Sequence, residues 1–285
     1  MRSTWVVFGY ALRESLRRRV FHAGLVLTTV FLSLYALGCS FVDVSRVRYM
    51  GAASKVVTID VSVAATVLGM AVFATYFFGV SLAIFLTISA VRGDAEQGVL
   101  QALIVRPLTR WQFLLGRLLA AVTVAVFYVA IVFAAALAIT DWTLGWTPHH
   151  ALAAGLEISA AIAVVAVVSM LSSVYLSGIA NGIGVFMLFG AGLFGGLLGQ
   201  IGKAVDSHKL EQTATIIRYV TPFEWLYQSS LGRLIQGENG VTEMVLRLGP
   251  FGGSVQGGSL VWLWSAAYVL VLGGATVFAF ARRDL

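Results

Sequence analysis

Long apolar stretches separated by short polar segments dominate the chain. A helix needs about 20 apolar residues to cross the hydrocarbon core of a bilayer. Stretches of this length are found at about Val20–Val42, Val61–Val91, Phe113–Thr140, Ala151–Leu176, Gly182–Ile201 and Leu260–Ala281. These runs are continuous and do not alternate with polar residues, which argues against a membrane β-barrel. The pattern therefore predicts an all-α polytopic membrane protein with six transmembrane helices.

The composition excludes the soluble classes. Apolar residues of the AVILMFWYC set make up 59% of the 285 residues, and charged residues only 11%. A soluble protein of this size could not cover so much apolar surface with so few charges. The single cysteine rules out a disulfide scaffold. The net charge of +6 therefore indicates contact with a membrane, and we expect no nucleic-acid partner.

Basic residues predict the orientation of the spans. More than half of the 19 Lys and Arg residues lie before span one, between spans two and three or just beyond, and after span six. We therefore expect a multi-pass protein of the inner (plasma) membrane with both termini in the cytoplasm. The chain then divides into a cytoplasmic interfacial helix over residues 1–19 and a six-span membrane domain over residues 20–285.

The N-terminal segment Thr4–Arg19 predicts an amphipathic helix. Apolar residues share one face, namely Trp5, Phe8, Leu12 and Leu16, and charged residues occupy the other, namely Arg13, Glu14, Arg17 and Arg18. Such a helix suits the inner headgroup layer, where arginines face anionic lipid. The same arginines also suit a simple topology signal, and the two roles are compatible.

A short helix is predicted in the cytoplasmic loop between spans two and three, at about residues 94–106. Asp94 and Gln97 have the spacing of a capping box, which starts a helix. Apolar residues follow at helical spacing: Val99, Leu100 and Leu103. Pro107 moves Arg106 out of helical geometry and ends this helix. An exposed short helix with apolar side chains needs a cover, which is either lipid headgroups or a partner protein.

The third span begins directly after this break. Thr109 is a plausible N-cap residue with Gln112 three positions later, and Leu108 and Phe113 have the spacing of a hydrophobic staple. The sequence therefore predicts a short helix joined tightly to the second and third spans.

The polar outer segment, about residues 200–259, predicts two amphipathic helices before span six. The first covers about Ser207–Tyr219, with Leu210, Ala214 and Ile217 on its apolar face. The second begins at Pro222, where Thr221 and Glu224 have the spacing of a capping box. These helices could lie on the outer leaflet, or dip into it, as a gate. A surface hairpin that only joins spans five and six is the alternative.

Polar and small residues within the spans supply further candidates for a pathway. Glycines four residues apart in span five allow helices to approach closely, either between two subunits or within one. Glu157 could mark a transport path, but a position in the outer headgroup layer is favoured. Asn181 could bind a neighbouring helix, but capping of span five is favoured. The candidate pathway or gate residues are Glu157, Asn181, Gly192, Gly196, Pro222 and Glu224.

The loop between spans two and three resembles a known signature. Its residues are Glu96-Gln-Gly98-Val99-Leu100, Leu103, Arg106-Pro107-Leu108, Arg110 and Leu115-Gly116-Arg117. They are similar to the pattern E-x-G-T-L-x-x-L-L-x-x-P-x-x-R-x-x-x-L-x-G-K of the type-2 ATP-binding cassette exporter permeases. Val99 stands where Thr is common, and Arg117 where Lys is common. The segments ALRESLRRRVF, YVTPFEWL and FARRDL also resemble corresponding parts of that family.

The resemblance implies a permease subunit whose residues 94–106 form a coupling helix. In that family the coupling helix docks on a separate ATPase subunit, which carries ATP and Mg²⁺. The residues assigned to this contact are Asp94, Glu96, Gly98, Val99, Leu100, Leu103, Arg106 and Pro107. A second copy or a paralogue would complete the exporter.

No enzyme chemistry is predicted for this chain alone. It has no G-x-x-x-x-G-K-[ST] phosphate loop and no clustered metal ligands, so we expect no cofactor or metal in it. Two other functions remain open: a secondary transporter driven by an ion gradient, and a membrane scaffold that does not transport.

Overall fold

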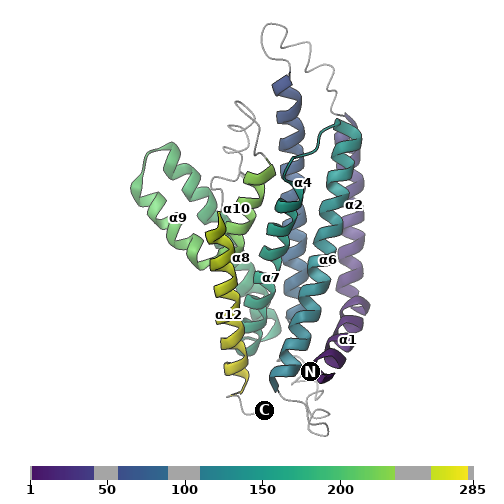
Figure 1. Ribbon diagram of the computed structural model, residues 1–285, viewed down its shortest axis with the longest axis vertical. Helices are drawn as coiled ribbons and strands as arrows, with labels where there is room; N and C mark the ends of the chain where they lie inside the picture. The colour runs from purple at the N-terminus through teal and green to yellow at the C-terminus, as the bar shows by residue number, and fades with distance from the viewer. Residues whose placement is uncertain (1, 42–56, 89–109, 235–257, 282–285) are drawn as a thin grey trace.

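The computed structural model describes residues 2–41, 57–88, 110–234 and 258–281 (Figure 1). Within these ranges the regular structure is entirely helical. The helices are α1 (Arg2–Arg17), α2 (Arg19–Phe41), α4 (Val57–Thr87), α6 (Arg110–Leu144), α7 (Ala151–Tyr175), α8 (Gly178–Ala204), α9 (His208–Val220), α10 (Pro222–Leu234) and α12 (Ser259–Ala281).

Six of these helices are long and apolar enough to cross a membrane, which confirms the predicted span count. They are α2, α4, α6, α7, α8 and α12. Figure 1 shows α1 and the last turns of α12 at the same end of the bundle, whereas α9 lies toward the opposite end. An even number of crossings requires this arrangement. We call the end that holds α1 the α1 end, and the other the α9 end.

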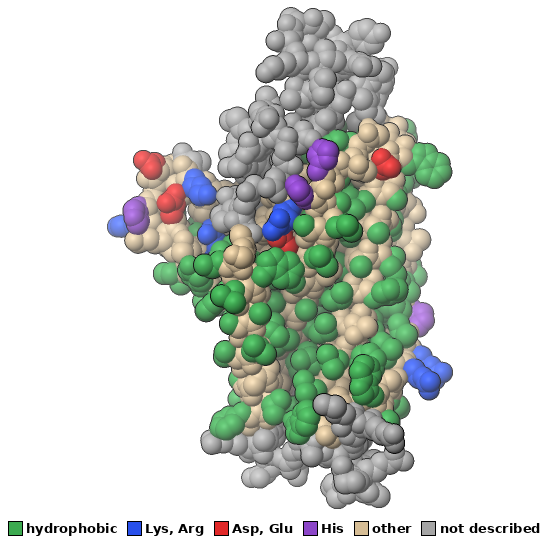
Figure 2. Space-filling view, in the orientation of Figure 1, with side chains coloured by type: hydrophobic (Ala, Val, Ile, Leu, Met, Phe, Trp, Pro, Cys, Tyr) green, Lys and Arg blue, Asp and Glu red, His purple; other side chains and the backbone are tan. Residues whose placement is uncertain are grey.

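The surface of the bundle carries an apolar band. Figure 2 shows hydrophobic side chains over the middle of the molecule, and most charged side chains toward its two ends. Large apolar residues are exposed on the surface of the spanning helices, for example Leu34 of α2, Phe127 of α6 and Leu270 of α12. So many exposed apolar side chains are favourable in lipid and would be unfavourable in water.

Several helix boundaries differ from the expected spans. Helix α6 continues past Thr140 to Leu144 and ends before Gly145, whose φ of 63° glycine adopts without strain. Helix α8 begins at Gly178 rather than Gly182, directly after the extended residue Ser177. The expected interfacial helix stops at Arg17, and α2 begins at Arg19 after a bend.

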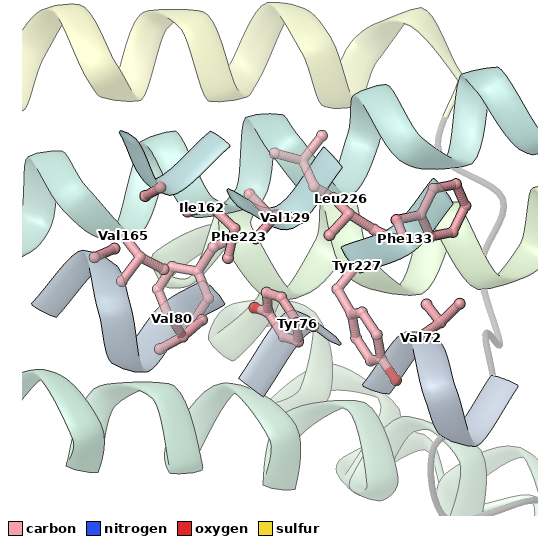
Figure 3. Packing of buried hydrophobic residues seen from close by; sticks show 14 of the residues in the cluster. Val72, Tyr76, Val80, Val129, Phe133, Ile162, Val165, Phe223, Leu226 and Tyr227 are labelled. Carbon is pink, nitrogen blue, oxygen red and sulfur yellow. The ribbon is translucent and has the colours of Figure 1, made fainter. Parts of the chain in front are cut away.

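The core lies between α4, α6, α7 and α10, and α10 supplies several of its largest side chains. Figure 3 shows Tyr227, Leu226 and Phe223 of α10 beside Tyr76 and Val72 of α4. The rings of Tyr76 and Tyr227 stack with centroids 4.4 Å apart. Although α10 is too short to cross a membrane, all of its residues except Arg233 are buried. The bundle therefore encloses this short helix.

Close packing between α4, α6 and α7 depends on Gly79. A Cβ atom at this position would lie 2.4 Å from Cγ2 of Val129 and 2.9 Å from Cδ1 of Ile162. Only a residue without a side chain lets the three helices approach this closely.

We predict that Gly79→Ala lowers the free energy of unfolding by about 1–3 kcal/mol, because the added methyl group overpacks the core. Thermal unfolding of the detergent-solubilised protein measures the effect. Gly190→Ala is the matched control, since nothing lies within 4 Å of its Cβ position. Equal midpoints for the two variants would contradict the packing argument.

Candidate functional site

The predicted coupling residues lie outside the described part of the chain. They are Asp94, Glu96, Gly98, Val99, Leu100, Leu103, Arg106 and Pro107. The structure does describe both helices to which this segment is attached. Helix α4 ends at Thr87, and α6 begins at Arg110, in agreement with the predicted start of span three. The contacts of these two helix ends show which other helices would be displaced if residues 89–109 moved.

The end of α4 is bonded to α7 and, through α7, to α8. The hydroxyl of Thr87 donates a hydrogen bond of 2.7 Å to Oγ of Ser169 in α7. Nδ2 of Asn181 in α8 donates to the backbone oxygen of Ser169 at 3.2 Å. All three residues are fully buried. Asn181 therefore binds a neighbouring helix, and the favoured expectation that it caps span five is wrong.

Glycines at the start of α8 hold the end of α4 still more closely. A Cβ atom on Gly182 would lie 2.9 Å from Cδ1 of Ile88, and one on Gly178 would lie 3.8 Å from the Ile88 backbone oxygen. Both glycines therefore serve packing within one chain. The polar contact and the close approach together join α4, α7 and α8 at this end of the bundle.

The beginning of α6 is held by α1. A Cβ atom on Gly116 would lie 2.8 Å from Cγ1 of Val7 and 3.1 Å from the backbone oxygen of Thr4. The α1 face against α6 thus includes Val7 and the buried residues Ala11 and Ser15. Trp5 and Leu16, on the predicted apolar face, are exposed and available to lipid.

An ion pair reinforces the contact between α1 and α6. Nη2 of Arg117 lies 3.0 Å from Oε2 of Glu14, and Nη2 of Arg18 lies 2.6 Å from Oε1 of the same carboxylate. Burial alone would raise the pKa of Glu14, but the hydrogen bond from Arg18 and the charges of both arginines outweigh it and lower that pKa. Arg18 therefore binds within the protein, whereas Arg13 and Arg17 are exposed as expected.

A second polar region surrounds α9 and α10, the two outer helices that the sequence predicts. Leu210, Ala214 and Ile217, which form the predicted apolar face of α9, lie against α8. They meet the positions where a Cβ atom would lie on Gly202, Gly199 and Gly195, respectively. These α8 glycines therefore pack against α9 of the same chain.

Gly192 and Gly196 make room for α10. A Cβ atom on Gly192 would lie 3.2 Å from Cβ of Glu224, and one on Gly196 would lie 2.8 Å from Nε2 of Gln228. Gly192, Gly196 and Glu224, which the sequence analysis singled out as separate gate candidates, are thus in contact. The side chains of the predicted capping box make other hydrogen bonds. The hydroxyl of Thr221 donates to the backbone oxygen of Ile217, and Oε1 of Glu224 accepts from Nε2 of Gln228. Pro222 does occupy the first position of α10.

Glu224 is a buried acid in α10, which is not one of the six spans. Its side chain is 3% exposed, and its Oε2 atom has no hydrogen-bond partner among the described residues. Burial raises the pKa of Glu224 to about 8 from an ordinary value of 4.5, although the hydrogen bond from Gln228 partly opposes the shift. At neutral pH the carboxyl group is therefore mostly protonated. Beside it, α8, α9 and α10 enclose a small cavity that also contacts Arg218 and Trp225.

Glu157 holds α10 to α7. Its Oε1 atom accepts a 2.6 Å hydrogen bond from Nε of Arg233, and the Glu157 side chain is 1% exposed. The favoured position in the headgroup layer is therefore wrong: this carboxylate is enclosed by protein and paired with a cation. Arg233 was not singled out in the sequence, because 76 residues separate the two partners.

The fold and the two polar regions define a polytopic α-helical membrane protein with a buried short helix before its last span. A family model described as "ABC-2 family transporter protein" matches residues 5–285. The match covers nearly the whole chain, so the chain belongs to this family and is a membrane permease of the ATP-binding cassette type. Its role is in transport and not in catalysis. None of the curated proteins matches the chain closely enough to be reported as a relative.

We predict that Arg233→Gln lowers the free energy of unfolding by about 3–5 kcal/mol, because it leaves the Glu157 carboxylate buried without its cation. The double variant Glu157→Gln/Arg233→Gln should recover much of this loss, since it removes both charges. Thermal unfolding of wild type, both single variants and the double variant measures the interaction. Additive effects of the two changes would show that the ion pair does not couple α7 to α10.

Glu224 should make stability depend on pH. Because its pKa is raised by folding, the stabilisation is complete below pH 4.5 and is lost as pH rises from there through about 8. Glu224→Gln, which mimics the protonated acid, should flatten this decline in the unfolding midpoint. Glu211→Gln on exposed α9 is the control and should keep the wild-type slope. Parallel curves for wild type and Glu224→Gln would contradict the assignment.

Proposed function

We propose that this permease is the membrane subunit of an exporter, driven by separate ATPase subunits that bind ATP and Mg²⁺. Family membership supports an ATP-driven mechanism over an ion-gradient transporter or a passive scaffold. The observation that carries the proposal is that both helices joined by residues 89–109 are attached to other helices close to that segment. A force applied to the segment would therefore displace several helices together.

On this proposal, residues 94–106 form the coupling helix, and ATP-driven closure of the ATPases moves it. The α4 side transmits the movement through Thr87 to α7 and α8. The α6 side carries α1 along through the Glu14–Arg117 ion pair. Two-state switching of packed helices is a common means of linking distant sites.

Helix α8 connects the two ends of the bundle. Near its start, Gly182 contacts Ile88; farther along, Gly192 and Gly196 contact Glu224 and Gln228 of α10. A shift of α8 would therefore alter the packing of α9 and α10. We propose that these two helices act as an outer gate and that substrate leaves at the α9 end.

The proposal also sets the orientation and assembly. The α1 end faces the cytoplasm of a cell whose inner (plasma) membrane holds the protein, because the coupling segment must reach an ATPase there. The positive-inside bias of the sequence supports this orientation. Two copies, or this chain and a paralogue, would enclose the conduit, and two ATPase subunits would bind below them.

The test combines co-purification with ATP hydrolysis, using the permease and candidate ATPase subunits in lipid nanodiscs. We predict that Glu96→Arg and Leu100→Asp, on the proposed coupling helix, detach the ATPase or abolish stimulation of hydrolysis by the permease. Membrane insertion should remain normal, since both changes lie outside the spans.

Glu211→Arg and Leu152→Asp are the matched controls, because they make the same changes at exposed positions in α9 and at the start of α7. They should keep wild-type binding and hydrolysis. If no ATPase binds the wild-type chain, the exporter proposal fails. If the coupling variants behave like the controls, residues 94–106 are not the contact.

A further inference from the structure

Helix α1 bears an open basic pocket at the α1 end of the bundle. Tyr10, Arg13, Glu14, Arg17 and Arg18 line it, and it contains about 840 Å³ of empty space, part of which is open to the surroundings. Positions 10, 13, 14 and 17 share one face of a helix, because residues three and four apart are neighbours. Figure 2 shows Lys and Arg side chains near this end of the molecule.

The pocket has more positive than negative charge. Its one carboxylate, Glu14, is already engaged by Arg18 and by Arg117 of α6. In the described part of the chain, no acidic group lies within ion-pair distance of Arg13 or Arg17, and both are exposed. An anion entering the pocket would therefore meet two guanidinium groups that no acidic group of the described residues neutralises.

Apolar surface lies beside this charge. Trp5 is 70% exposed, Val6 is 66% exposed and Leu16 is 43% exposed, all on α1. An acidic protein segment or a soluble anion would be attracted by the arginines but would not need this apolar surface. A phospholipid needs both, because its phosphate is anionic and its acyl chains are apolar.

We propose that this pocket binds the headgroup of an anionic phospholipid, with its phosphate on Arg13 and Arg17. The proposal deepens the proposed function in one respect: assignment of the lipid to the inner leaflet rests on the cytoplasmic orientation given above. The hydroxyl of Tyr10, which is also exposed, can donate a further hydrogen bond to the headgroup. Since Glu14 joins the pocket to Arg117, a bound lipid would anchor α1 and the beginning of α6 together at the membrane surface.

The test measures lipid binding to the detergent-solubilised full chain by native mass spectrometry. Phosphatidylglycerol is the probe, and phosphatidylcholine with identical acyl chains is the neutral comparison. Wild type should bind phosphatidylglycerol more tightly. Arg13→Gln/Arg17→Gln should weaken that binding by about ten- to thirtyfold, since each arginine near the phosphate contributes about three- to fivefold to the affinity.

Arg19→Gln/Lys209→Gln is the control, because it removes the same charge from two exposed residues that do not line the pocket. It should stay within about twofold of wild type. Equal losses in the two double variants, or equal affinity for the two lipids, would overturn the proposal.

Two competing ligands test the other possible occupants of the pocket, which are a soluble phosphate and an acidic protein segment. Glycerol phosphate should not displace the lipid at equal concentration; if it does, the pocket is a site for soluble phosphate. A polyglutamate peptide that displaces the lipid in the same way would assign the pocket to an acidic protein, and either result would overturn the lipid proposal. The lipid-binding test uses no ATPase and assumes no membrane orientation. The lipid proposal can therefore fail while the exporter proposal stands, and the exporter proposal can fail while the lipid proposal stands.

Discussion

Residues 89–109 connect α4 to α6, and each of these helices is attached to a neighbour near that connection. The Thr87–Ser169 hydrogen bond is fully buried, and the Arg117 side chain is 9% exposed where it meets Glu14. The Thr87–Ser169 hydrogen bond is costly to break, since the separated groups find no water to replace the lost partner. The Glu14–Arg117 pair is weaker, because Glu14 is 31% exposed and water screens its charge. The attachments therefore tie the end of α4 to α7 and the beginning of α6 to α1, and the proposed coupling of the ATPase to the membrane helices depends on them.

The same physical rule organises the α9 end. Helix α10 buries Glu224 and Gln228 and places Arg233 at the edge of the bundle. A buried acid requires a partner or the loss of its charge, and a buried amide requires a hydrogen bond. Arg233 meets Glu157, and Glu224 meets Gln228 while burial favours its protonated form. Close packing is possible because α8 presents glycines to both outer helices. The proposed gate therefore requires α10 to move together with α8, against which it packs.

The sequence predicted much of this architecture, because apolar length and helix-start signals are local. The six spans, the start of α6 and the apolar face of α9 were predicted from spacing alone. Pairings between distant residues were not. Glu157 and Asn181 were expected at the lipid headgroups and at a helix cap, but their partners, Arg233 and Ser169, lie on other helices. Glu14, a single acid among arginines, and Arg117, a charge inside a span, were the signals that could have predicted the α1–α6 ion pair.

The central claim is that movement at the α4–α6 connection reaches the outer helices through α8. Spin labels on Lys209→Cys in α9 and Leu152→Cys at the start of α7, in a Cys39→Ala background, report the distance between these helices by pulsed electron paramagnetic resonance. With the partner ATPase bound, ATP should change this distance in wild type. It should not do so in Gly182→Leu, in which the added side chain disturbs the α4–α8 contact while the ATPase still hydrolyses ATP. A wild-type distance that nucleotide leaves unchanged would contradict the account.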